Sequence, residues 1–259
     1  MSRLLVAIPL LVAALALIIW GTLPMWKTTM TIVVLLAAWE WARLAGFSGT
    51  ASIVYVFFFA ILLAAGDTLL AGNLPASSTV FESVCFFWIV GAPLYILLNR
   101  RWHPTIFGGL GMVILFATWH AANTLFAQNL YTLLGALAVV WTADTAAYAA
   151  GKIAGKTPMA PTVSPGKTWE GFFGGMLAVL LLSYVAHKTF ELPSLLLLVS
   201  AFALLALSVL GDLFESAAKR HGGVKDSGTL LGGHGGVLDR LDAMLPTLPF
   251  AALLSPWLI

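Results

Sequence analysis

The chain has 259 residues, of which 60% are hydrophobic and only 9% are charged, and its mean hydropathy is +0.97. This composition excludes an ordinary soluble domain, because the repeated apolar runs of about 20 residues match the thickness of a bilayer core. The net charge of +2 is too small, and its basic residues too scattered, to indicate nucleic-acid binding. A single cysteine, Cys85, excludes an intramolecular disulfide and a multi-thiolate metal site.

Apolar segments of similar length follow one another along the whole chain. The first, Leu4 to Trp20, has the character of a signal peptide, but the many similar segments after it favour a transmembrane helix. We predict an all-α fold, a polytopic integral membrane protein with about nine transmembrane helices in one domain, residues 1–259. The predicted spans are residues 4–23, 28–46, 51–71, 79–98, 105–127, 130–150, 171–190, 193–212 and 241–258.

The lysines and arginines are unevenly divided between the two sides of the predicted helices. If the N-terminus is cytoplasmic, eleven of them lie on that side and only two, Lys27 and Lys188, lie on the other. Cytoplasmic loops of membrane proteins carry such an excess. We therefore expect the two long polar connections, residues 151–170 and 213–240, to face the cytoplasm.

The polar residues of the N-terminal part fit structural roles. Glu40 lies between two tryptophans, which is typical of an interfacial aromatic belt with an acid that reaches up to water. Asp67 and Glu82 flank a polar stretch on the opposite face, where we expect structural roles. For His120, in the middle of a span, we expect an interhelical hydrogen bond.

Two G-K-T triplets, Gly155 to Thr157 and Gly166 to Thr168, invite comparison with a phosphate-binding P-loop. The glycine that this motif requires five residues earlier is Ala150 in one case and Pro161 in the other. We also expect no strand before either triplet. These two observations argue against a P-loop.

Several residues around the first polar connection are candidates for a site. Asp144 lies near the cytoplasmic end of the sixth expected span, and an ionisable residue within a span is a functional candidate by default. Ser164, Lys167 and Thr168 come just before the seventh helix, although Lys167 also fits a positive-inside anchor. The G-x-x-x-G spacing of residues 171–175 predicts close helix packing.

Nine of the chain's 24 charged residues lie between Asp212 and Asp242. If the eighth helix continues past Asp212, this residue shares one face with Glu215 and Ser216, and Asp239 and Asp242 repeat the acid spacing. Paired oxygen ligands at a membrane surface suit Mg²⁺, which completes its coordination with water and phosphate oxygens. This stretch is therefore the strongest candidate for a metal-dependent site.

Four cations, Lys219, Arg220, Lys225 and Arg240, lie beside these acids. A metal with a cationic clamp suits a polyphosphate, because phosphoryl and nucleotidyl transfer depend mainly on positioning and charge neutralisation. The glycines of the stretch would let backbone amides approach phosphate oxygens, whereas a flexible solvated loop is the alternative. His234 fits three roles: a base, a phosphate donor or a hydrogen-bonded turn residue.

The polar stretch of residues 216–242 resembles the signature of the phosphatidate cytidylyltransferase (CDP-diacylglycerol synthase) family. It matches S-x-x-K-R-x₄-K-D and then H-G-G-x-x-D-R-x-D almost position for position. Ala218 stands where a bulkier apolar residue is usual, and Gly232 stands where proline is expected. The resemblance extends over essentially the whole chain and includes Asp144, Tyr148, Gly151, the S-P-x-K-T-x-E-G run of residues 164–171 and the W-E-W of residues 39–41.

This resemblance implies that CTP and phosphatidic acid condense to CDP-diacylglycerol and pyrophosphate. It implies a homodimer among the lipids of a bacterial-type inner membrane, with its site facing the cytoplasm. The cofactors implied are Mg²⁺ and a second, monovalent cation such as K⁺, with Asp212 and Asp239 as the first metal ligands and Asp144 close by. Residues 1–127 would be the scaffold and lipid contact, and residues 128–259 the catalytic part.

The resemblance and the charge pattern together predict the residues of the site. The predicted catalytic residues are Asp212, Asp239, Lys167, Lys219, Arg220, Lys225, Asp226 and Asp242. The predicted substrate-binding residues are Ser164, Thr168, Ser216, His234, Gly235, Gly236 and Arg240.

Two other functions remain open at this point. A CTP-dependent prenol kinase would also need a metal and triphosphate groups, but it would transfer the γ-phosphoryl group and release CDP. An ion or phosphate transporter could use Asp144 and Asp212 as pathway residues, although the two halves of the chain show no repeat of the kind that transporters often have. A CDP-alcohol phosphotransferase is disfavoured, because its D-G-x-x-A-R pattern is absent.

Overall fold

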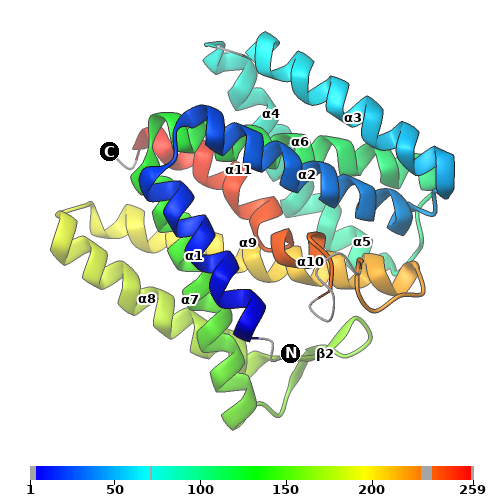
Figure 1. Cartoon of the computed structure of the whole chain (residues 1–259). Helices are drawn as coiled ribbons and strands as arrows, with labels where there is room; N and C mark the ends of the chain where they lie inside the picture. The colour runs from blue at the N-terminus through cyan, green and yellow to red at the C-terminus, as the bar shows by residue number, and fades with distance from the viewer. Residues whose placement is uncertain (1–3, 71, 229–234, 258–259) are drawn as a thin grey trace.

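The computed structural model describes residues 4–70, 72–228 and 235–257, with side chains from residue 12 onward. It is built almost entirely from helices, which confirms the predicted all-α fold (Figure 1). The protein is thus a polytopic integral membrane protein. Six helical segments of the described chain are long and apolar enough to cross a bilayer: Gly49–Leu70, Leu74–Leu98, Pro104–Gln128, Leu130–Ala154, Trp169–Phe190 and Ser194–His221.

Local sequence sets several helix ends. The Asn129 side chain accepts a hydrogen bond from the Thr132 N–H (3.0 Å) at the start of α7, and Gly46, with φ of 94°, ends α2 in the left-handed region. The N-terminal part contains α1 (Leu4–Trp20), α2 (Leu23–Ala45), α3 (Gly49–Leu70), α4 (Leu74–Phe86), the π-helical turn η1 (Phe87–Gly91), α5 (Ala92–Leu98) and α6 (Pro104–Gln128). The C-terminal part contains α7 (Leu130–Ala154), β1 (Pro158–Ala160), β2 (Ser164–Thr168), α8 (Trp169–Phe190), α9 (Ser194–His221), α10 (Leu238–Leu241), α11 (Met244–Leu254) and the 3₁₀ turn η3 (Ser255–Trp257).

Helices α7 and α8 lie side by side at close range (Figure 1). A Cβ atom on Gly171 would lie 2.8 Å from the carbonyl oxygen of Ala147, and one on Gly175 would lie 3.0 Å from that of Ala143. Only glycine fits this contact without a shift of the backbone. The predicted packing role of the G-x-x-x-G spacing is therefore confirmed.

The end of the chain differs from the single span expected over residues 241–258. It forms α10, then α11, and α11 packs against α4, α6, α7 and α9 inside the bundle. Eleven helical residues rise only about 16 Å, about half the thickness of a bilayer core. Pro246 and Pro249 are buried, and proline removes a helical hydrogen bond, so this segment is short and sheltered by protein.

Helix α9 is longer than the expected span of residues 193–212. It runs on to His221, so Glu215 and Ser216 are helical together with Asp212, as the predicted shared face requires. Lys219, Arg220 and His221 form its last turn, where positive charge complements the partial negative charge of the helix end.

The connection between α7 and α8 contains a small antiparallel hairpin, in which Pro158 pairs with Thr168 and Ala160 pairs with Ser164. Strand β1 precedes the second G-K-T triplet, so the expectation of no strand before that triplet was wrong. Val163, at the turn of the hairpin, is buried in the core that includes Phe214 of α9, so tertiary contacts support strands too short to be recognised in the sequence. Pro161 is still not glycine, and the P-loop stays excluded.

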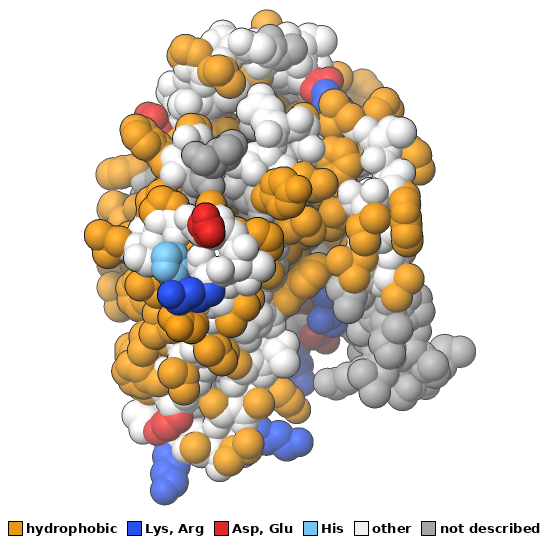
Figure 2. All heavy atoms as spheres, turned by 90° about the vertical axis from the view of Figure 1, so that its left-hand side faces the viewer, with side chains coloured by type: hydrophobic (Ala, Val, Ile, Leu, Met, Phe, Trp, Pro, Cys, Tyr) orange, Lys and Arg blue, Asp and Glu red, His pale blue; other side chains and the backbone are white. Residues whose placement is uncertain are grey.

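The outer surface is largely apolar, as a lipid-facing surface requires. Figure 2 shows a face on which hydrophobic side chains are widespread and charged side chains are few. Exposed residues of α8, including Phe173, Leu177 and Leu181, contribute to the apolar surface of the molecule. Inside the bundle, Cys85 is buried, and the His120 ring nitrogen lies 2.9 Å from the Ser77 hydroxyl on α4, which confirms the expected interhelical hydrogen bond.

Candidate active site

A cavity of about 370 Å³ lies between α7, α8, α9 and strand β2. Asp144 of α7, Lys167 of β2 and Asp212 of α9 line it, and the Lys167 ammonium forms an ion pair with the Asp212 carboxylate. Val209 and Leu205 line it about one and two helical turns before Asp212. Three predicted site residues from separate segments thus meet at one cavity, which also has an apolar wall.

The position of Lys167 depends on Glu170, in the first turn of α8. The Glu170 carboxylate accepts hydrogen bonds from the Thr157 hydroxyl (2.8 Å) and from the backbone N–H groups of Lys156 and Thr157 (both 3.2 Å). The Thr168 hydroxyl caps the start of α8. Both ends of the hairpin are therefore tied to α8, and Lys167 lies between these fixed points at the edge of the cavity.

A second group of charges surrounds Lys219 of α9. Its ammonium lies 2.5 Å from Glu215 Oε2 and 2.6 Å from Asp239 Oδ1. The Glu215 side chain is only 3% exposed, and its other oxygen, Oε1, is buried without a hydrogen-bond partner in the described structure. One cation thus serves two acids, and one buried carboxylate oxygen is left uncompensated.

Asp239, at the start of α10, accepts hydrogen bonds from three groups. Its Oδ2 lies 2.7 Å from the Gly236 N–H and 3.2 Å from the Ser227 N–H, and its Oδ1 pairs with Lys219. Burial alone would raise the pKa of Asp239, but its interaction with the Glu215 side chain, the hydrogen bonds from Lys219 and the Gly236 N–H, and the positive charge of Lys219 hold this pKa at about 2. Asp239 is therefore ionised at neutral pH.

Asp242 brings a further acid to the group. Burial, together with the negative charges of Asp212 and Glu215, raises the pKa of Asp242 well above its ordinary value. The acids on α9 therefore face the acids that begin and follow α10. The acids of the two predicted spacings, Asp212 with Glu215 and Asp239 with Asp242, therefore lie close to one another.

Glycines let the segment before α10 approach these acids. Gly235 has φ of 80°, in the left-handed region, and a Cβ atom there would lie 2.5 Å from Asp239 Oδ2. The Gly236 N–H donates to the same oxygen. Both glycines were predicted to bind substrate, and the structure shows them in contact with a predicted metal ligand.

Glu40 is the residue whose role the sequence interpretation misjudged. It does not reach up to water: it is 1% exposed, and its carboxylate accepts hydrogen bonds from the Ser227 hydroxyl (3.0 Å) and the N–H groups of Val237 (3.0 Å) and Leu238 (2.8 Å). The neighbouring Trp41 is buried as well, and its indole N–H donates to a carbonyl oxygen of α6. An acid inside an apolar segment was the signal that could have identified it.

Five other predicted residues lie outside these two groups. Lys225 and Asp226 are exposed after the end of α9, and Arg220 is exposed while its Nε contacts the Val163 carbonyl oxygen at 3.5 Å. Ser164 begins β2 and Ser216 lies on α9, both partly buried. Arg240 is exposed on α10, and His234 falls outside the described residues.

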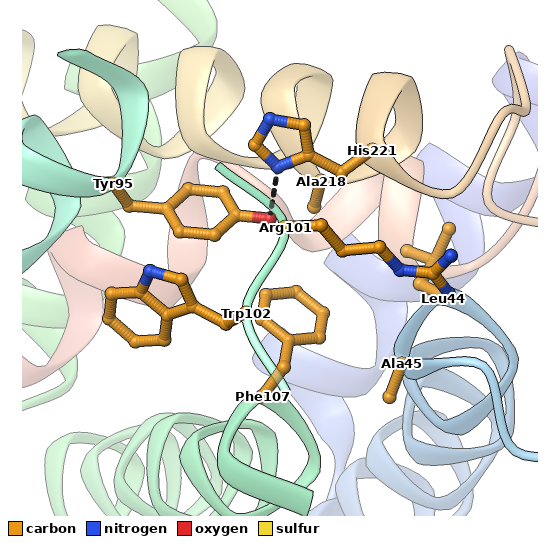
Figure 3. A pocket seen from close by; sticks show the side chains of 8 residues that line it. All are labelled: Leu44, Ala45, Tyr95, Arg101, Trp102, Phe107, Ala218 and His221. Carbon is orange, nitrogen blue, oxygen red and sulfur yellow. Dashed lines mark hydrogen bonds between the residues drawn. The ribbon is translucent and has the colours of Figure 1, made fainter. Parts of the chain in front are cut away.

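His221 was not recognised as a site-supporting residue in the sequence. Its Nδ1 lies 2.8 Å from the Tyr95 hydroxyl of α5, and its Nε2 lies 3.0 Å from Asn99 Oδ1. Because the Asn99 oxygen can only accept, His221 Nε2 carries the proton and Nδ1 accepts from Tyr95 (Figure 3). These contacts tie the end of α9, two residues after Lys219, to the N-terminal part.

The predicted metal ligands are divided between the two groups: Asp144 and Asp212 line the cavity, and Asp239 pairs with Lys219. In the part of the chain that the structure describes, no three Asp, Glu, His or Cys side chains are placed to hold one metal ion. A site of one or two carboxylates, completed by water and phosphate oxygens, is the kind that Mg²⁺ commonly occupies.

Comparison with known proteins identifies the family. The pattern of the cytidylyltransferase family matches residues 1–257. A phosphatidate cytidylyltransferase of Pseudomonas aeruginosa is 37% identical over 232 residues, which cover 86% of this chain and 84% of that protein. Those of Haemophilus influenzae (44% over 131 residues, 48% of this chain and 45% of that protein) and Bacillus subtilis (48% over 118 residues, 44% of each) are also similar. The chain therefore belongs to the cytidylyltransferase family of nucleotidyltransferases.

Proposed function

We propose that this protein is a phosphatidate cytidylyltransferase. A phosphate oxygen of phosphatidic acid attacks the α-phosphorus of CTP, the bond from that phosphorus to the α,β-bridging oxygen breaks, and pyrophosphate leaves with the bonding electrons. The product is CDP-diacylglycerol. The observation that carries this proposal is the cavity at which Lys167, Asp212 and Asp144 meet an apolar wall, in a chain whose relatives bear this name.

The two kinds of wall suit two kinds of substrate. Leu205 and Val209 offer an apolar surface to the acyl chains of a lipid, whereas Lys167 offers a positive charge to phosphate. The lipid phosphate is already an anion at neutral pH, so it needs no strong general base. The main task of the site is to reduce the repulsion between two anions and to stabilise the leaving pyrophosphate, which is work for Lys167 and Lys219.

Mg²⁺ is part of this proposal, with Asp212 and Asp239 as its first ligands, Asp144 nearby, and K⁺ as a second cation. The donor set fits: the two groups bring five acids together, and the buried Oε1 of Glu215 has no hydrogen-bond partner among the described residues. When bound, Mg²⁺ would supply charge neutralisation for the triphosphate. Asp212 and Asp239 would hold the metal ion, and Lys167 and Lys219 would bind phosphate oxygens.

The proposal also covers the side of the membrane on which the site lies and the number of chains that assemble. The excess of lysine and arginine on one side of the helices supports a site that faces the cytoplasm of a bacterial cell, where CTP enters from water while the lipid stays in the bilayer. We include a homodimer, as the family resemblance implies.

The test uses purified protein in mixed micelles with phosphatidic acid, Mg²⁺ and CTP labelled separately at the α- and γ-phosphorus. We expect the α-label in the lipid and the γ-label in pyrophosphate. The Asp212→Ala variant should lose this transfer, while Glu82→Ala, which changes an exposed acid on α4, should keep it. Transfer of γ-label to a prenol would replace the proposal by a kinase, and no turnover with either lipid would refute both.

A further inference from the structure

Glu40 links the two parts of the chain at the candidate active site. It lies on α2, and its hydrogen-bond partners Ser227 and Leu238 are 187 and 198 residues away in the sequence. Burying a carboxylate costs free energy unless hydrogen bonds replace the lost water. At 1% exposure, the Glu40 carboxylate is retained inside the protein by its three hydrogen bonds to this distant segment.

The same segments that bind Glu40 also bind Asp239. Ser227 donates its hydroxyl to Glu40 and its backbone N–H to Asp239. Gly236 donates its N–H to Asp239, and the next residue, Val237, donates its N–H to Glu40. Both carboxylates therefore bind the same two short stretches, residues 227–228 and 236–238, so a change at Glu40 is expected to reach Asp239 through these stretches.

Two glycines let the backbone of these stretches pass close to the Glu40 carboxylate. A Cβ atom on Gly228 would overlap Glu40 Oε1, and one on Gly236 would overlap Oε2 of the same carboxylate and the Ser227 hydroxyl. Only a backbone without side chains can approach the carboxylate to this distance. The contact is thus built from both sides, by a buried acid on α2 and by small residues in the connection.

We infer that Glu40 is a positioning residue, which sets the place of Asp239 by fixing residues 227–228 and 236–238. It does not touch the substrates. The expected effect of Glu40 on activity rests on the proposed cytidylyltransferase function, whereas its expected effect on the position of Asp239 does not. The chemical requirement is specific: three donors point at two carboxylate oxygens, and glutamine would place an NH₂ group against one or more of these donors.

The first experiment measures amide hydrogen exchange by mass spectrometry in the full-length protein in micelles. Glu40→Gln should speed exchange in peptides that contain residues 227–228 and 236–238 by about tenfold, because the donors of these segments lose a buried carboxylate acceptor. Exchange in α7 and α8 should not change. The matched control is Glu82→Gln, the same chemical change at an exposed position of α4. Unchanged exchange in both segments would refute the inference, whatever the wild-type activity.

The second experiment separates positioning from folding. Per folded molecule, measured by size-exclusion chromatography, Glu40→Gln should lower kcat about 30-fold and raise the Mg²⁺ concentration needed for half activity, as loss of a group that orients a ligand does. Ser227→Ala removes one of the three donors and should have a smaller effect in the same direction. A fall in activity that only follows the folded fraction would assign Glu40 a purely structural role. An inactive wild-type protein would refute the proposed function and leave the exchange result to decide the role of Glu40.

Discussion

Two ion-paired regions of this molecule differ in their charge balance. In the N-terminal part, Lys27 Nζ lies 2.6 Å from Asp67 Oδ1, one cation beside one acid, and both side chains are about 40% exposed (35% and 44%). In the C-terminal part, Lys167 and Lys219 lie among five acids: Asp144, Asp212, Glu215, Asp239 and Asp242. A balanced, partly exposed pair needs no further partner, whereas this cluster of acids is the region to which the proposed Mg²⁺ is assigned.

Removing an acid from each region should give the largest contrast. Asp212→Ala should lower kcat/KM about 100- to 1,000-fold, because it removes charge and a proposed metal ligand at the cavity. Asp67→Ala should change kcat/KM by less than about twofold, since it removes only a partly exposed pair. Both are measured by α-label transfer from CTP to lipid. Equal losses in the two variants would remove the distinction between the regions.

Lys219→Met tests the shared cation. It leaves the carboxylates of Glu215 and Asp239 without their ammonium, and breaking a buried pair from one side costs about 3 kcal/mol. We expect a lower midpoint of thermal unfolding in micelles and a loss of transfer activity. A double variant, Lys219→Met with Glu215→Gln, should recover part of the stability but not the activity. Full stability of the single variant would show that another cation replaces Lys219.

Gly211→Ala tests how closely α9 must approach the acid-rich region. A Cβ atom there would overlap the Asp242 carbonyl oxygen and would lie 3.0 Å from the Pro246 ring, so α9 and the start of α11 must move apart. Overpacking of this kind costs about 1–3 kcal/mol and should displace Asp212 as well. Gly135→Ala is the control, because no other element of the described structure lies within 4 Å of its Cβ position. Thermal unfolding and α-label transfer measure both variants, and similar behaviour of the two would contradict the close contact.

The smallest effect is expected for the balanced pair. Lys27→Met should lower the free energy of unfolding by less than about 1 kcal/mol, because a partly exposed ion pair gains little over hydration. A double-mutant cycle with Asp67→Ala, followed by thermal unfolding, measures the coupling directly. A coupling above about 2 kcal/mol would show that this pair resembles the C-terminal group more than its exposure indicates.

The sequence predicted which charged residues lie close together better than it predicted the connections between the helices. The periodic acids on α9 and the signature of residues 216–242 identified Asp212, Lys219 and Asp239 correctly as neighbours of other charges. The hairpin of residues 158–168 was missed, because its short strands are supported by the burial of Val163 against other elements. No local propensity encodes such support.

The sequence by itself determined that the chain is helical, that it belongs in a membrane and that it is a member of the cytidylyltransferase family, because apolar runs and a polar signature are patterns within short windows. Only the tertiary structure decided which partner each charge has and which apolar segment lies inside the bundle. Glu40 and α11 show the reason. Within its own segment, a buried acid such as Glu40 cannot be told from an acid at the membrane interface, because its hydrogen-bond donors come from residues far away in the chain. In the same way, a short internal helix such as α11 resembles a membrane span until the helices that surround it are known.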